Sequence, residues 1–276
     1  MLAYLQLMRL DKPIGILLLL WPTITAIWLA NPHPPVELIV IFVIGVVVMR
    51  AAGCVVNDYA DRHFDAHVER TQHRPLAQGI LTAKNALWTL LILLLMAACL
   101  LFFLNTLSWM IAGCALLTAM IYPFMKRYTY FPQIVLGIAF SWSIPMVYAA
   151  TIEQFPLTCW LLCLANICWT VAYDTEYAMV DRNDDIKIGI KSTAVLFGHY
   201  DKLIIGILQI ITVICLIIIG LSNHLSFIYY SGISIMSLLF LYQQWLINDR
   251  DRTRCFKAFQ NNNYVGLVMF LSVVIV

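Results

Sequence analysis

The sequence has too little charge for a protein that folds in water. Only 12% of its 276 residues are Asp, Glu, Lys or Arg, whereas 62% are hydrophobic and the mean hydropathy is +0.84. A soluble protein of this composition would have no polar surface to present to water. The composition excludes an ordinary soluble domain and predicts a polytopic membrane protein, with a lipid bilayer and no nucleic acid as its surroundings.

Two further features are missing. The first apolar run is followed by Asn31-Pro32-His33-Pro34-Pro35 and not by the small residues of a signal-peptide cleavage site. The eight Cys form no C-x-x-C pair, and most of them lie inside apolar runs. This pattern predicts buried packing residues, because zinc sites and disulfide frameworks have recognisable Cys spacings.

Long apolar runs divide the chain into membrane-length segments. A helix needs about 20 residues to cross a hydrocarbon core of about 30 Å. Eight runs meet this length approximately, at residues 13–30, 36–56, 86–104, 106–125, 131–150, 157–173, 203–221 and 225–247. A ninth starts near residue 264 and has thirteen residues before the sequence stops. We predict an all-α bundle of nine transmembrane helices, the last apparently truncated, in a single transmembrane domain over residues 1–276.

Lys and Arg are absent from alternate loops. The loops at 31–35, around 105, at 151–156 and at 222–224 contain neither residue. The positive-inside rule then places the N-terminus and the remaining loops on the cytoplasmic side. Of the fifteen acidic residues, only Glu37 and Glu153 belong to the opposite side.

Acidic residues gather in two clusters, each after a membrane-length segment. At about 100° per residue, a helix places Asp58, Asp61 and Asp65 within an arc of roughly 60°, with Asn57 beside them. The second cluster shares one helix face in the same way: Asp174, Tyr177, Asp181 and Asp185. Carboxylates this close repel one another unless a cation lies among them, and Mg²⁺ binds through a few carboxylates plus phosphate oxygens. The plain alternative, solvated loop acids, does not explain two face-aligned clusters at matching depth.

The spacing of the clusters suggests two related halves. Asp61 and Asp181 are 120 residues apart, and four apolar segments separate the clusters. This is the spacing of two four-helix pseudo-repeats in parallel orientation. The connections at about 57–85 and 174–202 are the longest predicted loops, and long loops in compact proteins usually carry function.

Basic residues accompany both clusters. They are Arg62, Arg70, Arg74 and Lys84 in the first loop, Lys126 and Arg127 after the fourth segment, and Arg182, Lys187 and Lys191 in the second loop. Carboxylates with Mg²⁺, joined by Arg and Lys, are the groups that bind a diphosphate. Arg70 and Arg74 lie inside the Asp loop, which favours a functional role for them. Arg250, Arg252 and Arg254 are better explained by membrane topology.

A diphosphate at the cytoplasmic interface of an apolar bundle suggests a lipid tail in the membrane. An allylic diphosphate ionises when the departing anion is stabilised, and the allylic cation must be hidden from water and can be held by aromatic faces. Four residues near the cytoplasmic ends could supply such faces: Tyr59, Tyr122, Tyr173 and Tyr177.

Several motifs resemble those of the UbiA family of intramembrane aromatic prenyltransferases over essentially the whole chain. They include Arg9-Leu10-Asp11-Lys12-Pro13-Ile14-Gly15, Trp21-Pro22-Thr23 and Asn57-Asp58-x-x-Asp61-x-x-x-Asp65. Residues 122–127, 143–146, 189–193 and 255–264 closely resemble the bacterial members that prenylate 4-hydroxybenzoate. The C-terminal end departs from the family pattern, because the family normally completes its last helix beyond Val276.

The resemblance implies a Mg²⁺-dependent enzyme of ubiquinone biosynthesis in the bacterial inner membrane, with its active site facing the cytoplasm. It would join a polyprenyl group from polyprenyl diphosphate to 4-hydroxybenzoate, ortho to the phenol. By position, the metal ligands would be Asn57, Asp58, Asp61, Asp65, Asp181 and Asp185. The catalytic acids would be Asp61, Asp65, Asp181 and Asp185. The substrate-binding residues would be Arg70, Arg74, Lys126, Arg127, Tyr177 and Lys191, with Arg127 or a neighbouring Arg pairing the aromatic carboxylate.

Three alternatives stay open. Another prenyltransferase of the same superfamily, for menaquinone, tocopherol or haem O, would share the Asp clusters. A cation-coupled transporter would place its carboxylates near the midplane instead of at one face. A magnesium-dependent lipid phosphotransferase would show a D-G-x-x-A-R pattern, which is absent. Within the favoured class, prenyl chain length is expected to depend on the depth and width of the lipid cavity.

Overall fold

The computed structural model of the protein describes residues 1–62, 64–67 and 70–275. Within these ranges the chain forms α-helices joined by short loops, and no strand is present. The helices are α1 (Leu2–Leu7), α2 (Ile14–Ala30), α3 (Val36–Asp61), α4 (Ala83–Leu101), α5 (Thr106–Met125), α6 (Pro132–Ser141), α7 (Ser143–Ile152), α8 (Leu157–Ile188), α9 (Thr193–Phe197), α10 (Asp201–Ser222), α11 (Phe227–Leu246) and α12 (Arg252–Val274). Two short 3₁₀ turns, Asp65–His67 and Gly198–Tyr200, complete the set.

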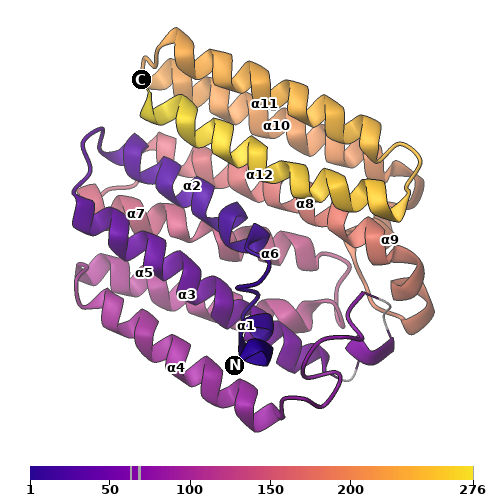
Figure 1. The fold of residues 1–276 in the computed structure, drawn as a ribbon. Helices are drawn as coiled ribbons and strands as arrows, with labels where there is room; N and C mark the ends of the chain where they lie inside the picture. The colour runs from indigo at the N-terminus through magenta and orange to yellow at the C-terminus, as the bar shows by residue number, and fades with distance from the viewer. Residues whose placement is uncertain (63, 68–69, 276) are drawn as a thin grey trace.

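The helices lie side by side in one bundle (Figure 1). Helices α10, α11 and α12 form one side, α3, α4 and α5 form the opposite side, and α2, α6, α7 and α8 lie between them. The largest buried cluster joins α2, α3, α7, α8, α10, α11 and α12 around Trp169 and Tyr148, which are almost fully buried. The long central helix α8 therefore contacts the main core and reaches the polar end of the molecule.

A helix covers each of the apolar segments that the sequence predicts, and α6 and α7 together cover one of them. In the described chain, six stretches are long and apolar enough to cross a membrane: Val36–Asp61, Ala83–Leu101, Thr106–Met125, Pro132–Ile152, Leu157–Ile188 and Thr193–Ser222. The protein is thus a multi-pass helical membrane protein. That α2, α11 and α12 also cross, giving nine spans in two pseudo-repeats, stays a prediction.

The predicted start of the last helix, near residue 264, is wrong. Helix α12 begins at Arg252, where the Asp251 side chain accepts a hydrogen bond from the Arg254 backbone N–H. The polar run 261–263 is typical of a loop, but here each Asn bonds to another helix. Asn261 accepts from Gln243, Asn262 from Trp169 and Asn263 from Trp21, at 2.8–3.0 Å. Polar side chains of this kind hold membrane helices together.

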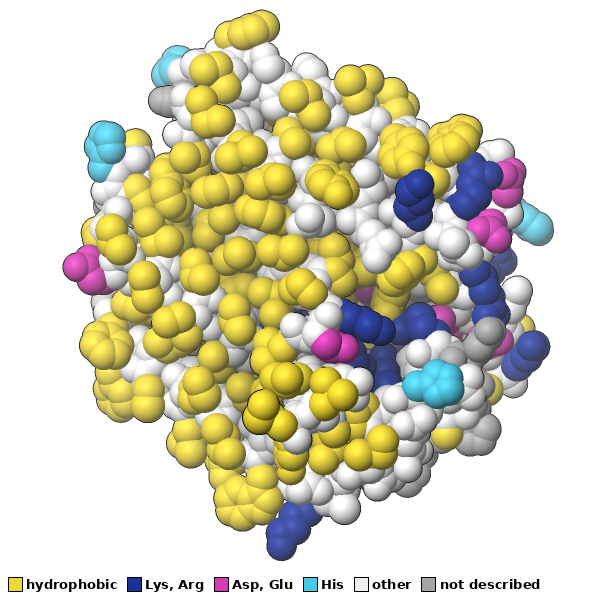
Figure 2. Space-filling model, viewed as in Figure 1, with side chains coloured by type: hydrophobic (Ala, Val, Ile, Leu, Met, Phe, Trp, Pro, Cys, Tyr) yellow, Lys and Arg dark blue, Asp and Glu magenta, His cyan; other side chains and the backbone are white. Residues whose placement is uncertain are grey.

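The predicted long loops also start too early. Helix α3 continues to Asp61, and α8 continues to Ile188, where Gly189 takes a left-handed conformation at φ 73° and turns the chain back. The second acidic cluster is therefore part of a helix and not of a loop. Figure 2 shows most Lys and Arg side chains of the visible face at the end of the bundle near α9, while hydrophobic side chains cover the rest.

Candidate active site

A polar cavity of about 150 Å³ opens between α3, α5, α6 and α8 at the basic end of the bundle. We call it the acidic cavity. Its acidic and amide lining consists of Asn57, Asp61, Asp65, Gln133, Asp174, Asp181 and Asp185. Its basic and phenolic lining consists of Arg70, Arg74, Tyr122, Lys126, Tyr177 and Lys191. The structure thus brings both predicted clusters to one cavity, on opposite helices.

The first cluster is neutralised by basic side chains from other parts of the chain. Asp61 forms an ion pair with Lys126 from the end of α5, and its second oxygen, Oδ1, is buried without a hydrogen-bond partner. Asp65 pairs with Arg74 at 2.8 Å. Although desolvation opposes the charge of Arg74, Asp58 and Asp65 raise the pKa of its guanidinium above the ordinary value. Arg74 therefore stays charged between these two acids.

Asp58 faces away from the acidic cavity. Its two carboxylate oxygens accept hydrogen bonds from Arg9 at 2.9 and 3.0 Å, and Arg74 lies 3.0 Å from Oδ1. The side chain is 1% exposed and lines a different cavity, described below. Of the predicted metal ligands, Asp58 is thus the one that the structure separates from the others.

The second cluster is less neutralised. Asp181 accepts from Arg70 Nε at 2.9 Å and from Arg70 NH2 at 2.5 Å, and the Arg70 guanidinium lies 4.5 Å from the centre of the Tyr177 ring. No basic side chain of the described chain lies within ion-pair distance of Asp174 or Asp185. Nor do any three Asp, Glu, His or Cys residues of the described ranges come close enough to hold a metal ion by themselves.

A wide cavity of about 380 Å³ lies on the other side of Arg70 and Tyr177. Residues of the N-terminal segment, α3, α8 and α12 line it, including Arg9, Lys12, Arg50, Asp58, Tyr173, Asp174, Phe256 and Phe259. Phe259 lies 4.5 Å from Tyr177 between ring centres, so α12 supplies an aromatic wall. The wide cavity combines aromatic faces with buried positive charge.

Arg50 is the main residue that sequence reasoning missed. It lies in the middle of α3, its Nε is buried without a hydrogen-bond partner, and its guanidinium lies 5.4 Å from the centre of the Phe140 ring. Gly15 makes room for it, since a Cβ there would be 2.6 Å from Arg50 Nε. The available signal was a single basic residue inside an apolar run, which is expensive in a membrane and is usually functional.

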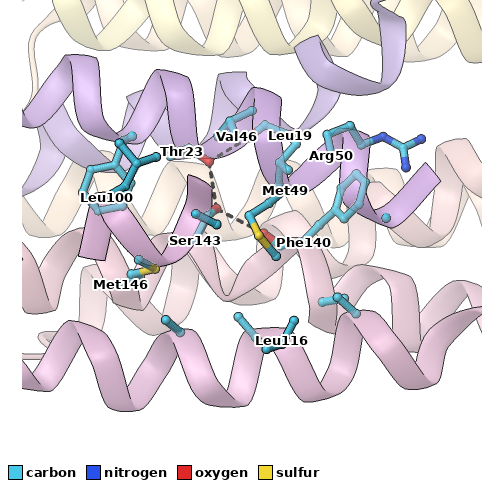
Figure 3. Close-up of a pocket in the computed structure, with 18 of the residues that line it drawn as sticks. Leu19, Thr23, Val46, Met49, Arg50, Leu100, Leu116, Phe140, Ser143 and Met146 are labelled. Carbon is cyan, nitrogen blue, oxygen red and sulfur yellow. Dashed lines mark hydrogen bonds between the residues drawn. The ribbon is translucent and has the colours of Figure 1, made fainter. Parts of the chain in front are cut away.

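An apolar cavity of about 260 Å³ lies deeper in the bundle, between α2, α3, α4, α5, α6 and α7. Figure 3 shows Arg50 and Phe140 at one end of it, with Met49 and Leu116 on facing walls. Among its lining residues, Thr23 of α2 donates to Ser143 Oγ of α7 at 2.8 Å. Tyr122 lines the acidic, the wide and the apolar cavity, so the three meet beside its ring.

The remaining predicted basic residues are placed differently. Lys126 and Lys191 line the acidic cavity, and the Lys191 backbone N–H donates to Lys126 O at 3.1 Å. Arg127 donates to Ala60 O at 2.5 Å and lies 5.2 Å from the centre of the Phe64 ring. It is outside the lining of all three cavities. The structure therefore brings together every predicted binding residue except Arg127.

A helical membrane bundle in which two Asp clusters face each other at one end is the architecture of an intramembrane prenyltransferase. The chain belongs to the UbiA prenyltransferase family, whose profile matches residues 19–274. It is 59% identical over 273 residues to a protein of Escherichia fergusonii named 4-hydroxybenzoate octaprenyltransferase, covering 99% of this chain and 94% of that one. A protein of the same name from Enterobacter sp. (strain 638) is 58% identical with the same coverage.

Solved structures share the fold. An apo structure of a UbiA homologue from Aeropyrum pernix K1 matches with a TM-score of 0.84 and 20% identity over 94% of this chain and 97% of that one. A UbiA homologue from Archaeoglobus fulgidus, bound to GPP and Mg²⁺, matches with a TM-score of 0.75 and 19% identity over 99% of this chain and 100% of that one. At these identities the likeness establishes the fold alone.

Proposed function

We propose that this chain transfers a polyprenyl group from polyprenyl diphosphate to 4-hydroxybenzoate, ortho to the phenol, and releases diphosphate in ubiquinone biosynthesis. The observation that carries the proposal is the junction at Tyr122, where an acidic, an aromatic-lined basic and an apolar cavity meet. Each suits one part of the reaction: the diphosphate, the aromatic acid and the prenyl tail. The names of the curated relatives agree with prenyl transfer to 4-hydroxybenzoate.

The acidic cavity supplies carboxylate donors for a divalent metal, and phosphate oxygens of the substrate would complete its ligands. Asp61 Oδ1 is buried without a partner, and the Asp185 carboxylate has no basic partner among the described residues. Mg²⁺ takes oxygen ligands and accepts phosphate oxygens beside a few carboxylates. The residues that would hold it are Asn57, Asp61, Asp65, Asp181 and Asp185. An ion held there would supply positive charge to the departing diphosphate.

The chain's own basic residues would hold the same anion. Arg70, Arg74 and Lys126 line the acidic cavity and already bind carboxylates there, and phosphate oxygens are equivalent partners for them. When the carbon–oxygen bond of the diphosphate breaks, these side chains stabilise the negative charge that develops on the diphosphate. Such preorganised charge is usually the largest contribution to catalysis.

Aromatic rings would protect the allylic cation. The Tyr122 ring lies at the junction, where an aromatic face can hold a cation. The Tyr177 ring, which Arg70 and Phe259 already contact, forms part of the adjoining wall. The ring carbon ortho to the phenol oxygen then attacks the cation and a carbon–carbon bond forms. That ring carbon passes its proton to a carboxylate at the junction, for which Asp174 is placed because it lines both the acidic and the wide cavity. Water is kept out by the apolar walls on the opposite side of Tyr122.

The wide cavity suits the aromatic acid, with Arg50 as partner of its carboxylate. The Arg50 guanidinium has a free buried Nε and lies beside aromatic rings, whereas Arg127 already donates to Ala60 O outside the cavities. A planar guanidinium binds a carboxylate through two parallel hydrogen bonds. We therefore assign the aromatic carboxylate to Arg50 in place of the predicted Arg127.

The orientation in the bacterial inner membrane belongs to the same proposal. Lys and Arg are absent from the loops at 31–35, 151–156 and 222–224, and they gather at the end of the bundle that holds the acidic cavity. The positive-inside rule places that end in the cytoplasm. Diphosphate would then be released into the cytoplasm.

The test is a product assay with purified protein. Mass spectrometry should detect a prenylated 4-hydroxybenzoate when that acid and a polyprenyl diphosphate are supplied, with other aromatic acids giving less. A chelator should abolish product formation and Mg²⁺ should restore it. Full turnover in metal-free buffer would contradict the role of the Asp clusters, and isotope uptake by vesicles without product would favour the transporter.

A further inference from the structure

Helix α3 has two glycines along the wall of the apolar cavity, Gly45 and Gly53. Glycine is unfavourable inside a helix relative to alanine, because it loses more conformational freedom and has no side chain to pack. A mid-helix glycine therefore needs a reason. In most cases the reason is a close neighbour or a left-handed backbone.

Neither reason applies to Gly53. Its φ is not in the left-handed region, and a Cβ built on it would meet no atom within 4 Å outside its own helix. Other helical glycines of the bundle are different. A Cβ on Gly266 would be 2.4 Å from Trp21, and one on Gly232 would be 2.4 Å from Ser272. Gly266 and Gly232 are thus required by packing, whereas the space at Gly53 is open.

That space lies on the route between two cavities. Asn57, one turn towards the end of α3, lines the acidic cavity, and Met49, one turn in the other direction, lines the apolar cavity. Gly45 follows one further turn away. Four residues of helix are about 6 Å long, so Gly53 lies about 6 Å along the helix axis from Asn57, and Gly45 lies about 18 Å from it.

We propose that Gly53 is a specificity-determining residue: its missing side chain lets an isoprenoid chain pass from the acidic cavity into the apolar cavity. Gly45 leaves room for the isoprenoid chain in the same way, deeper in the apolar cavity. This inference rests on the function proposed above and refines it. A side chain at residue 53 blocks everything beyond the first isoprene unit, whereas one at residue 45 blocks only longer chains.

The chain offers a matched set of variants. Gly53→Leu places a side chain in open space, so the fold is expected to stay intact, and thermal unfolding checks this. Gly45→Leu meets the Leu100 side chain, which is 3.9 Å from the position that a Cβ would take. Gly113 in α5 is the control, because it is also a helical glycine with nothing within 4 Å, but it is exposed and outside the cavity lining.

The experiment measures kcat/KM with geranyl diphosphate and with octaprenyl diphosphate, and inhibition by inorganic diphosphate as a probe without a tail. Gly53→Leu should lose roughly 10- to 200-fold or more with both prenyl substrates, the range found when a pocket meets an extra apolar group. Gly45→Leu should lose activity with octaprenyl diphosphate and retain it with geranyl diphosphate. Gly113→Leu should match the wild type, and inorganic diphosphate should inhibit all four proteins equally.

The outcomes separate this inference from the proposed function. If wild-type protein prenylates 4-hydroxybenzoate and Gly53→Leu does so equally well with both substrates, the inference is wrong and the function stands. If Gly53→Leu folds but inorganic diphosphate no longer inhibits it, residue 53 acts on the diphosphate site and not on the tail, which also overturns the inference. If wild-type protein transfers no prenyl group at all, the proposed function itself fails.

Discussion

The two acidic clusters have similar sequences of Asp residues but different electrostatic environments. In the first, at the end of α3 and just beyond it, Arg9, Arg74 and Lys126 pair with the acids. In the second, inside α8, Arg70 pairs with Asp181, while no basic side chain of the described chain reaches Asp185. A carboxylate paired with a protein cation must exchange that partner before it can bind a metal ion. The second cluster is therefore the one prepared to receive an incoming cation.

The largest effect on activity should come from removing a carboxylate of the second cluster. Asp185→Asn should lower kcat/KM by about 10²–10³-fold, the usual loss when one preorganised group at the reacting charge is removed. It should also weaken Mn²⁺ binding to the purified protein, measured by electron paramagnetic resonance. Asp249→Asn is the control, since Asp249 is exposed and pairs with Arg254 away from the cavities. Wild-type rates for Asp185→Asn would mean that the second cluster is a solvated helix end without a role in catalysis.

The next effect concerns Arg50, which forms no ion pair with a described residue of either cluster. Arg50→Gln should raise KM for 4-hydroxybenzoate by roughly 10- to 150-fold, because a charge-assisted hydrogen bond contributes about 1.5–3 kcal/mol. KM for the polyprenyl diphosphate should change little, and Arg50→Lys should be intermediate because it keeps the charge but loses the planar fork.

Arg127→Gln is the matched comparison for Arg50. Steady-state kinetics with each substrate varied in turn should show a near wild-type KM for the acid, because Arg127 points away from the cavities. A larger rise for Arg127→Gln than for Arg50→Gln would restore the assignment made from the sequence.

A smaller effect on activity is expected at Asp58. Asp58→Asn should lower activity by less than about tenfold, as an uncharged amide keeps one hydrogen bond to Arg9, yet it should lower the unfolding temperature, since a buried charge pair is broken. Mn²⁺ affinity should stay at the wild-type value, whereas Asp61→Asn should lose it. Equal losses of Mn²⁺ binding in both variants would make Asp58 a metal ligand, as the sequence predicted.

The smallest effect should come from a contact behind the second cluster. The Thr193 hydroxyl shares a hydrogen bond with Thr175 of α8 at 2.7 Å, and the Thr193 backbone N–H donates to Gln133 at 3.0 Å. Thr193→Val should raise KM for the diphosphate about 2- to 10-fold, consistent with one net hydrogen bond of about 0.5–1.5 kcal/mol. Thr193→Ser should restore the wild-type KM, and a rise in KM for the acid alone would contradict this reasoning.

Much of the architecture could be predicted from the sequence, because apolar length and helical period determine it. The segment that became α8 was recognisable from its hydropathy, and the shared face of Asp174, Tyr177, Asp181 and Asp185 followed from 100° per residue. The start of α12 was not predictable in this way. Its polar residues bond to Trp21, Trp169 and Gln243, which lie on other helices.

The site residues differ in the same way: some follow from helical period, and others depend on contacts with distant parts of the chain. Asp58 and Asp61 are three residues apart and differ by about 60° around α3, which is enough to place them on different cavities. Which of them meets the acidic cavity depends on Arg9 and Arg74, from elsewhere in the chain. The place of the Arg50 guanidinium also depends on a distant residue, because Gly15 leaves the room for it.

The limited size of the apolar cavity affects how the concentration of the prenyl substrate should be expressed. The cavity extends to Ile41, about 24 Å along α3 from Asn57, so it holds only the first part of a long polyprenyl chain. The rest of the chain would remain among lipid tails during the reaction. The relevant concentration is then the mole fraction of prenyl diphosphate in the bilayer. Adding inert lipid at constant total substrate should therefore slow turnover, whereas concentrating the vesicles without changing their composition should not alter the rate per enzyme.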